Sequence, residues 1–179
     1  GQTYYHGALL AKRNVVVQHN YDYAAGEGFG NRKTAPLKYL LAYILPGIGV
    51  SSFLQNKTRS RDLILNPYDE TLFLDETPWN TRTDDILFLG RLVRAKGTRI
   101  LIDAVALLSQ RGQDFRLTII GTGPDADALK TQVERLDIGA QVQFSGALPP
   151  DQVAAVANRH RLVVVPSTHA EGFGLVATE

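Results

Sequence analysis

The chain has neither cysteine nor methionine among its 179 residues. Without cysteine it has no disulfide framework and no thiolate metal site, and this composition fits a cytoplasmic protein. Without methionine, and with Gly1 as its first residue, we expect it to be processed or to be an internal piece of a longer chain. We therefore predict a cytoplasmic location, with association at the inner face of a membrane as an alternative.

A large charge excess and a long apolar run are also missing. The 19 Lys and Arg residues nearly balance the 18 Asp and Glu residues, whereas a nucleic-acid-binding protein usually carries a basic excess on one face. We therefore expect no nucleic-acid partner. The longest apolar run, residues 39–50, is too short to cross a bilayer and is interrupted by Pro46 and Gly47. The basic residues Arg32, Lys33 and Lys38 leave a peripheral membrane contact as an alternative.

The second half of the chain alternates apolar runs typical of strands with segments of helical periodicity. Hydrophobic residues make up 44% and charged residues 21% of the chain, as in ordinary globular proteins. One helix is expected to bury the apolar positions Ile100, Leu101, Ala104, Val105, Leu107 and Leu108, and Asp125 is expected to cap or open the next. This alternation predicts an α/β fold with a Rossmann-like, doubly wound parallel sheet. The predicted strands are residues 86–89, 115–120, 142–144 and 162–165, the last of them buried.

The first half predicts part of a second α/β domain. Strands are expected at residues 14–18, 48–52 and 63–65, and Pro36 opens a helix between the first two. The segment 77–84 has no period and is interpreted as a linker, with Trp79 as a packing anchor. The predicted domains are therefore residues 1–76, which are a partial domain, and residues 85–179, which are truncated.

Glycines and cations follow the predicted strands of the second domain. In an open parallel sheet the ligand lies across the carboxyl ends of the strands. Arg91 and Lys96 lie in the first such loop, where two fixed cations would favour a bound anion or would simply be solvated. The small residues of these loops let the backbone approach a ligand or merely permit tight turns. They are Gly90, Gly121, Gly123, Ser145 and Gly146.

The last eighteen residues, LVVVPSTHAEGFGLVATE, predict a strand, a loop and the first turn of a helix. The unpaired N–H groups at a helix N-terminus attract phosphate. Glu171 and Glu179 bracket the glycine-containing turn, and carboxylates beside a phosphate are better suited to sugar hydroxyls. This pattern suits a nucleotide sugar.

This stretch resembles the E-x7-E motif of retaining glycosyltransferases with the two-domain GT-B architecture, of the family four type (glycosyl transferases group 1). The resemblance implies that Glu171 contacts the donor sugar and that Glu179 binds the ribose. Arg91 and Lys96 would then hold the diphosphate, and His19 would lie near donor and acceptor or simply end a strand. The turn implied to face the diphosphate consists of Gly172, Phe173, Gly174 and Leu175.

The same resemblance implies a metal-independent reaction without a cofactor. The donor would be a UDP-, GDP- or ADP-sugar, and the acceptor a sugar, a lipid-linked molecule or a small molecule. The four His residues have no metal-ligand spacing, and Asp84-Asp85 lacks a D-x-D pattern.

Two features depart from the family. Pro67 replaces the usual glycine in the turn from Asn66 to Asp69, and the chain is about half the length that two full domains need. The alternative is therefore a non-catalytic nucleotide-sugar-binding fragment or remnant.

Overall fold

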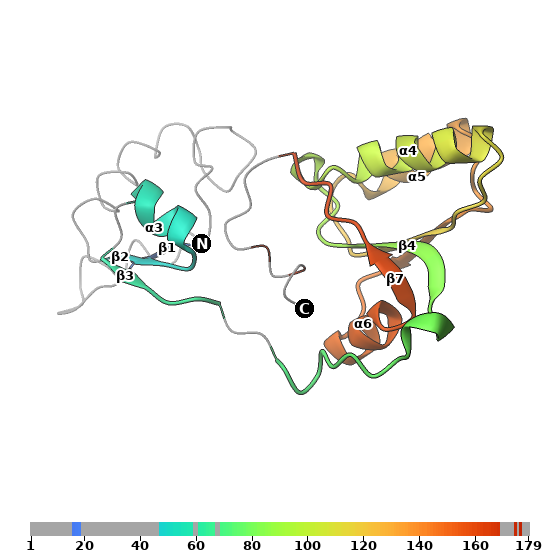
Figure 1. The fold of residues 1–179 in the computed structure, drawn as a ribbon. Coiled ribbons are helices and arrows are strands. Elements are labelled where there is room, and N and C mark those ends of the chain that lie inside the picture. The colour runs from blue at the N-terminus through green and yellow to red at the C-terminus, as the bar shows by residue number, and fades with distance from the viewer. Residues whose placement is uncertain are drawn as a thin grey trace, which may run out of the picture. The chain divides into compact units, whose positions relative to one another are not determined.

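The computed structural model describes residues 16–18, 47–58, 61–66, 69–168, 174 and 176. Its internal contacts divide the chain near residue 67 into two units, with residues 1–67 in the first and residues 68–170 in the second (Figure 1). Each unit contains a parallel sheet. None of the described helices is long and apolar enough to cross a membrane.

The first unit contains three short parallel strands. They are ordered β1-β2-β3 in the sheet and consist of β1 (Val16–Gln18), β2 (Gly47–Gly49) and β3 (Asp62–Leu63). These positions confirm the strand expected at 14–18 over residues 16–18. β2 and β3 each begin one residue before the strands expected at 48–52 and 63–65, and each ends earlier. The helix expected after Pro36 lies outside the described residues.

Helix α3 (Ser52–Thr58) packs against β2 in the first unit. The Ser51 side chain accepts a hydrogen bond from the Leu54 amide at 3.2 Å, which caps the helix, and Leu54 is completely buried. A Cβ at Gly49 would lie 2.8 Å from backbone atoms of Gln55. The polar cap therefore ends the predicted strand early, and glycine permits the close approach of helix to strand.

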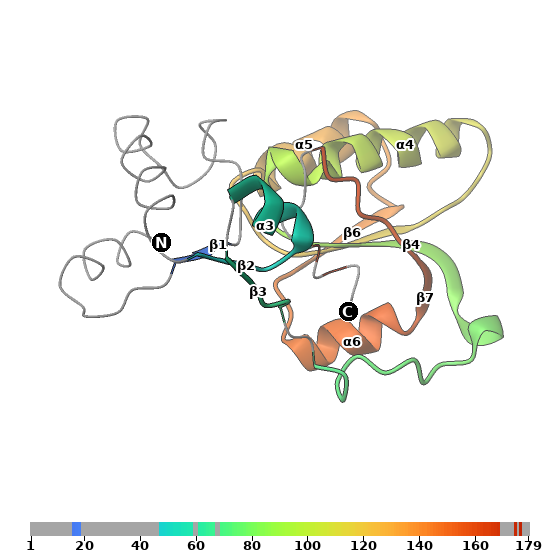
Figure 2. The ribbon, with the colours of Figure 1, turned by 60° about the vertical axis from the view of Figure 1, so that its left-hand side comes forward.

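The second unit contains a four-stranded parallel sheet in the order β6-β5-β4-β7. Helices α4 and α5 cover one face and α6 covers the other (Figures 1 and 2), which confirms the predicted doubly wound sheet. The strands are β4 (Thr83–Leu89), β5 (Leu117–Ile120), β6 (Val142–Gly146) and β7 (His160–Val163). The helices are α4 (Thr98–Gln110), α5 (Ala126–Arg135) and α6 (Pro150–Ala157).

Residues 86–89 of β4 are apolar on both faces of the sheet, because helices cover both faces there. Ile86 and Phe88 pack in the cluster beneath α4 and α5, whereas Leu87 packs with Ile120 and with Val153 of α6. Successive side chains of a strand point to opposite faces. A continuous apolar run such as 86–89 is therefore the pattern of a central parallel strand.

The buried face of α4 differs from the predicted one. Leu101, Ile102, Val105 and Ala106 are buried, whereas Ile100 and Leu107 are each 55% exposed. Ala104 is exposed as well, so three of the predicted core positions are surface positions. The hydrophobic periodicity located the helix correctly but assigned three exposed residues to its buried face.

The prediction that residues 162–165 form a buried strand is wrong. Strand β7 spans His160–Val163, and the exposed fractions of Leu162, Val163 and Val165 are 47%, 41% and 42%. The cause is position, because β7 is the edge of the described sheet and pairs there with β4 alone. An apolar run does not distinguish a central strand from an edge strand.

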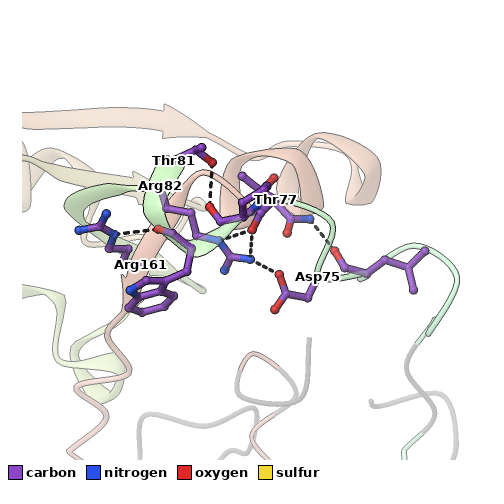
Figure 3. A network of polar contacts seen from close by, with 9 residues as sticks. Asp75, Thr77, Thr81, Arg82 and Arg161 are labelled. Atoms are coloured by element: carbon purple, nitrogen blue, oxygen red, sulfur yellow. Dashed lines mark hydrogen bonds and ion pairs between the residues drawn. The ribbon is translucent and has the colours of Figure 1, made fainter.

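The segment predicted to be a linker packs against the second unit (Figure 3). Trp79–Thr81 form the short 3₁₀ helix η1, and the Arg161 guanidinium on β7 donates to the Trp79 carbonyl at 3.0 Å and pairs with Asp84 at 2.5 Å. The Arg82 side chain donates to the Thr77 carbonyl at 2.7 Å and pairs with Asp75. These contacts place the division between the units earlier in the chain than segment 77–84.

Trp79 is held by its backbone and by two cations. The Arg82 and Arg161 guanidinium carbons lie 5.9 and 5.7 Å from the centre of its ring, within the range of cation–π attraction. The side chain is nevertheless 63% exposed. Trp79 is therefore a surface anchor.

Asp69 organises a local turn. Its carboxylate accepts hydrogen bonds from Thr71 Oγ1 at 2.6 Å and from the Thr71 amide at 3.0 Å, and its carbonyl accepts from the Leu72 amide. The Thr71 hydroxyl, followed by the Thr71 and Leu72 amides, lowers the pKa of the Asp69 carboxyl. Phe73, which follows this turn, packs against the core beside α6.

Candidate functional site

Four loops leave the carboxyl ends of the four strands in the second unit. Because the strands are parallel, these loops lie at the same edge of the sheet, where ligands of doubly wound folds bind. They are residues 90–97, 121–125, 147–149 and 164–168.

The loop after β4 presents two predicted cations on a constrained backbone. The Gly90 amide donates to Ile120 O at 3.0 Å, and the Leu92 amide donates to Thr122 O at 2.9 Å. Leu92 is 2% exposed and packs in the core, whereas its neighbour Arg91 is exposed. The buried leucine fixes the backbone from which the Arg91 side chain extends.

Lys96 ends a single helical turn in the same loop. Arg94–Lys96 form the 3₁₀ helix η2, in which the Lys96 amide donates to Val93 O at 2.9 Å and the Gly97 amide donates to Arg94 O at 3.1 Å. Gly97 adopts a left-handed φ of 70° and leads into α4. The turn therefore places both predicted cations in one short loop at the carboxyl edge.

The glycines of the next loop allow close backbone contacts. A Cβ at Gly121 would lie 1.9 Å from Gly90 O, and a Cβ at Gly123 would lie 2.2 Å from Leu92 O. The Gly121 amide also donates to Gly146 O at 2.7 Å. Two of the loops and the end of β6 thus pack together, which explains Gly121 and Gly123 without a ligand.

The prediction that Asp125 caps or opens α5 is confirmed by its place at the start of the helix. Asp125 is the N-cap residue of α5, but its side chain makes no capping hydrogen bond. Its amide instead donates to Leu92 O at 3.1 Å. Through its backbone amide, Asp125 therefore joins the loop after β5 to the loop that carries Arg91.

The loop after β7 contacts the loop that carries Lys96. The amide and hydroxyl of Thr168 donate to Ala95 O at 2.9 and 3.3 Å. A Cβ at Gly97 would lie 2.0 Å from Pro166 O. Nothing in the sequence pattern indicated these contacts, because they join backbone groups about seventy residues apart.

Part of the predicted site lies outside the described residues. Gly174 is described and has a left-handed φ of 76°, which favours glycine. Ser145 and Gly146 are half-exposed at the end of β6. The predicted site residues outside the described ranges are His19, Glu171, Gly172, Phe173, Leu175 and Glu179.

A cavity of about 760 Å³ lies at the opposite end of the same sheet. Its lining includes Thr83, Leu117, Val142 and His160, which stand at or near the amino ends of the four strands. The cations and glycines are at the carboxyl edge. The chemistry of these loops therefore favours the carboxyl edge as the site.

Residues 69–168, together with the shorter described ranges, contain no group of three or more His, Asp or Glu side chains able to hold a metal ion. The described loops supply guanidinium, ammonium and amide groups at the carboxyl edge. Such donors suit an anion.

The profile of the family described as Glycosyl transferases group 1 matches residues 69–179, which is more than half of the sequence. The chain therefore belongs to this family. Its described sheet has the parallel α/β architecture of GT-B glycosyltransferases.

Individual relatives extend over different parts of the chain. The D-inositol 3-phosphate glycosyltransferase of Corynebacterium glutamicum is 38% identical over 103 residues, covering 54% of this chain and 24% of that protein. The amylovoran biosynthesis glycosyltransferase AmsK of Erwinia amylovora is 28% identical over 171 residues, covering 95% of this chain and 40% of that protein.

Among solved structures, HepE of Anabaena in complex with UDP and glucose has a TM-score of 0.76 at 23% identity. The alignment covers 98% of this chain and 53% of HepE. The likeness shows the fold. The chain thus spans between a quarter and about half of the length of these relatives.

Proposed function

We propose that the protein transfers a sugar from a nucleotide diphosphate sugar to an acceptor, with retention of anomeric configuration and without a metal ion. One observation carries the proposal. The loop with Arg91 and Lys96 and the segment leading to Glu171 are in direct contact at the carboxyl edge of one sheet. Membership of the glycosyl transferases group 1 family supports it.

The leaving group of the proposed reaction is a nucleoside diphosphate. A nucleoside diphosphate gains negative charge as the bond to the sugar breaks. Fixed cations at Arg91 and Lys96 therefore stabilise the transition state more than the ground state. In this proposal Glu171 holds sugar hydroxyls and Glu179 holds the ribose. The amides of residues 172–174 bind the phosphate, and the leaving phosphate helps to deprotonate the acceptor.

The names of the relatives guide the choice of substrates. HepE was solved with UDP and glucose, which supports a UDP-sugar as the first donor to test, with GDP- and ADP-sugars next. The C. glutamicum relative is named for an inositol phosphate, which supports a small polyol or sugar acceptor. We also propose lipid-linked molecules as acceptors. The protein would be cytoplasmic, with a peripheral contact to a membrane.

The test is a transfer and donor-hydrolysis assay on the full chain with UDP-glucose, GDP-mannose and ADP-glucose. Replacing Arg91 or Lys96 by Ala should lower kcat/KM on the order of 10²-fold because each removes a preorganised charge. The matched control is Arg94→Ala, which removes an exposed cation from the same loop. Equal activity in Arg91→Ala, Lys96→Ala and the control would contradict the assigned roles.

A second function is favoured by the short coverage of the relatives. The chain spans 24% of one relative and 40% of another, so a unit that binds nucleotide sugars without turnover is the alternative. Binding of a donor without transfer or hydrolysis would support it. A folded sample that binds none of the three donors would remove both functions.

A further inference from the structure

Thr168 makes two hydrogen bonds to a single acceptor. Its amide donates to Ala95 O at 2.9 Å, and its hydroxyl donates to the same oxygen at 3.3 Å. A carbonyl oxygen has two lone pairs and can accept both. The pair joins the loop after β7 to the loop after β4 across more than seventy residues of chain.

The acceptor belongs to a turn that is already closed. Ala95 is the middle residue of η2, and the turn is held by hydrogen bonds from the Lys96 amide to Val93 O and from the Gly97 amide to Arg94 O. Thr168 therefore binds a defined turn. Carbonyls at the end of a helical turn commonly need such an outside donor.

A second contact lies on the other side of Lys96. Gly97 packs so closely against the Pro166 carbonyl that a Cβ at Gly97 would lie 2.0 Å from that oxygen. The two residues that flank Lys96 in sequence thus both contact residues 166–168. This arrangement fixes the backbone of Lys96 relative to the segment that leads to Glu171.

We propose that Thr168 is a positioning residue for the bound donor. By holding residues 166–168 against Ala95, it fixes the backbone of the turn that carries Lys96. The Lys96 ammonium group can then address the diphosphate of the donor. This inference rests on the proposed function and adds to it a residue that touches neither the substrate nor the reacting atoms.

A purely structural role and a positioning role differ in what they change. If the contact is only structural, its loss lowers the stability of the fold. Nucleotide affinity then stays intact, or the affinities for all nucleotides fall by the same factor. A positioning contact acts through Lys96. It therefore weakens binding of a nucleoside diphosphate more than binding of the monophosphate with the same base, and its effect disappears when Lys96 is absent.

The experiment is calorimetric titration of the full chain with UDP, GDP and ADP, followed by the monophosphate of the base that binds. Thr168→Val keeps the shape and the amide but removes the hydroxyl, and Thr168→Ser restores the hydroxyl. Because Thr168 is exposed, Val leaves no cavity. Loss of one hydrogen bond is expected to weaken diphosphate binding about fivefold in Thr168→Val, with less than a twofold change for the monophosphate and near-normal binding in Thr168→Ser.

A double-mutant cycle completes the test. In the Lys96→Ala background, Thr168→Val should cause no further loss of diphosphate affinity. Additive losses, equal losses for monophosphate and diphosphate, or unchanged affinity in Thr168→Val would each overturn the positioning role while leaving the proposed function in place. A wild-type chain that binds none of the three diphosphates would overturn the proposed function and this inference with it.

Discussion

Gly97 carries two constraints at the residue scale. Its φ of 70° is rarely adopted by residues with a Cβ, and its Cβ position is occupied by the Pro166 carbonyl. Gly112 shares the first constraint, with a φ of 74°, but has no neighbouring atom within 4 Å of its Cβ position. Substitutions at the two glycines therefore separate the effect of backbone strain on stability from the effect of close packing.

Replacing Gly112 by Ala should lower the free energy of unfolding by about 1–2 kcal/mol, the cost of a left-handed residue with a Cβ. Replacing Gly97 by Ala should cost clearly more, because the loop carrying Pro166 must also move. Denaturant unfolding of both variants measures the difference. Equal losses would show that the two loops are not in contact.

Two buried polar side chains near α4 differ in how they are satisfied. Thr98 is 2% exposed, and its hydroxyl has no hydrogen-bond partner among the described residues. Gln132 is 5% exposed and donates to Asp103 Oδ1 at 2.7 Å and to Arg99 O at 3.1 Å. A buried polar group without a partner lowers stability, whereas a satisfied one contributes to it.

Thr98→Val should therefore raise the free energy of unfolding, by up to about 1 kcal/mol, because it removes an unpaired hydroxyl at nearly constant volume. Gln132→Leu should lower it by about 1 kcal/mol, since two acceptors lose their donor. Thermal or denaturant unfolding compares the two variants. A destabilised Thr98→Val protein would show that the hydroxyl has a partner.

The Asp69 carboxyl is the one described group with a resolved change of pKa, and its pKa is lowered. A lowered folded-state pKa contributes stability above the unfolded-state pKa, and this stability is lost as the pH falls through the folded-state pKa. Thr71→Val removes the largest cause and should raise the pKa of Asp69. Carboxyl NMR titration of the wild-type protein and of the variant measures it. An unchanged pKa of Asp69 in Thr71→Val would show that the Thr71 hydroxyl does not bond to the Asp69 carboxylate.

At the scale of the element, most strands and helices of the second unit could be predicted from the sequence. Both faces of β4 and β5 are buried, so apolar runs indicated their positions well. The same rule failed at β7, because an edge strand carries an equally apolar run. It also failed at segment 77–84, which has no period but is held by side-chain hydrogen bonds from Arg82 and Arg161.

Arg161→Met tests whether this segment belongs to the second unit. It removes the hydrogen bond to Trp79 O, the ion pair with Asp84 and one of the two cations beside the indole. The free energy of unfolding should fall by about 1–2 kcal/mol. Amide hydrogen exchange at Thr81 and Arg82, which donate within η1, should accelerate.

The control for this variant is Arg159→Met, whose side chain donates to Ala155 O within its own helical region. Its effect on exchange at Thr81 and Arg82 should be much smaller. If both variants left this exchange unchanged, segment 77–84 would be independent of β7, as a free linker would be.

At the scale of the whole molecule, the two ends of the second sheet offer different chemistry. The carboxyl edge carries Arg91, Lys96 and close-packed glycine loops, and the amino end carries the 760 Å³ cavity. The sequence located the cations and glycines of the carboxyl edge because strand ends can be read from the pattern. It did not reveal which loops touch, since the contacts of Gly121 with Gly90 and of Thr168 with Ala95 are tertiary.

The central claim is that one crevice at the carboxyl edge holds an activated sugar. Hydrogen–deuterium exchange of the full chain, with and without saturating UDP-glucose, GDP-mannose or ADP-glucose, tests it most directly. A bound donor should protect residues 90–97 and residues 164–168 together. Protection confined to the amino-end residues 139–143 and 159–160, or to only one of the two loops, would contradict it.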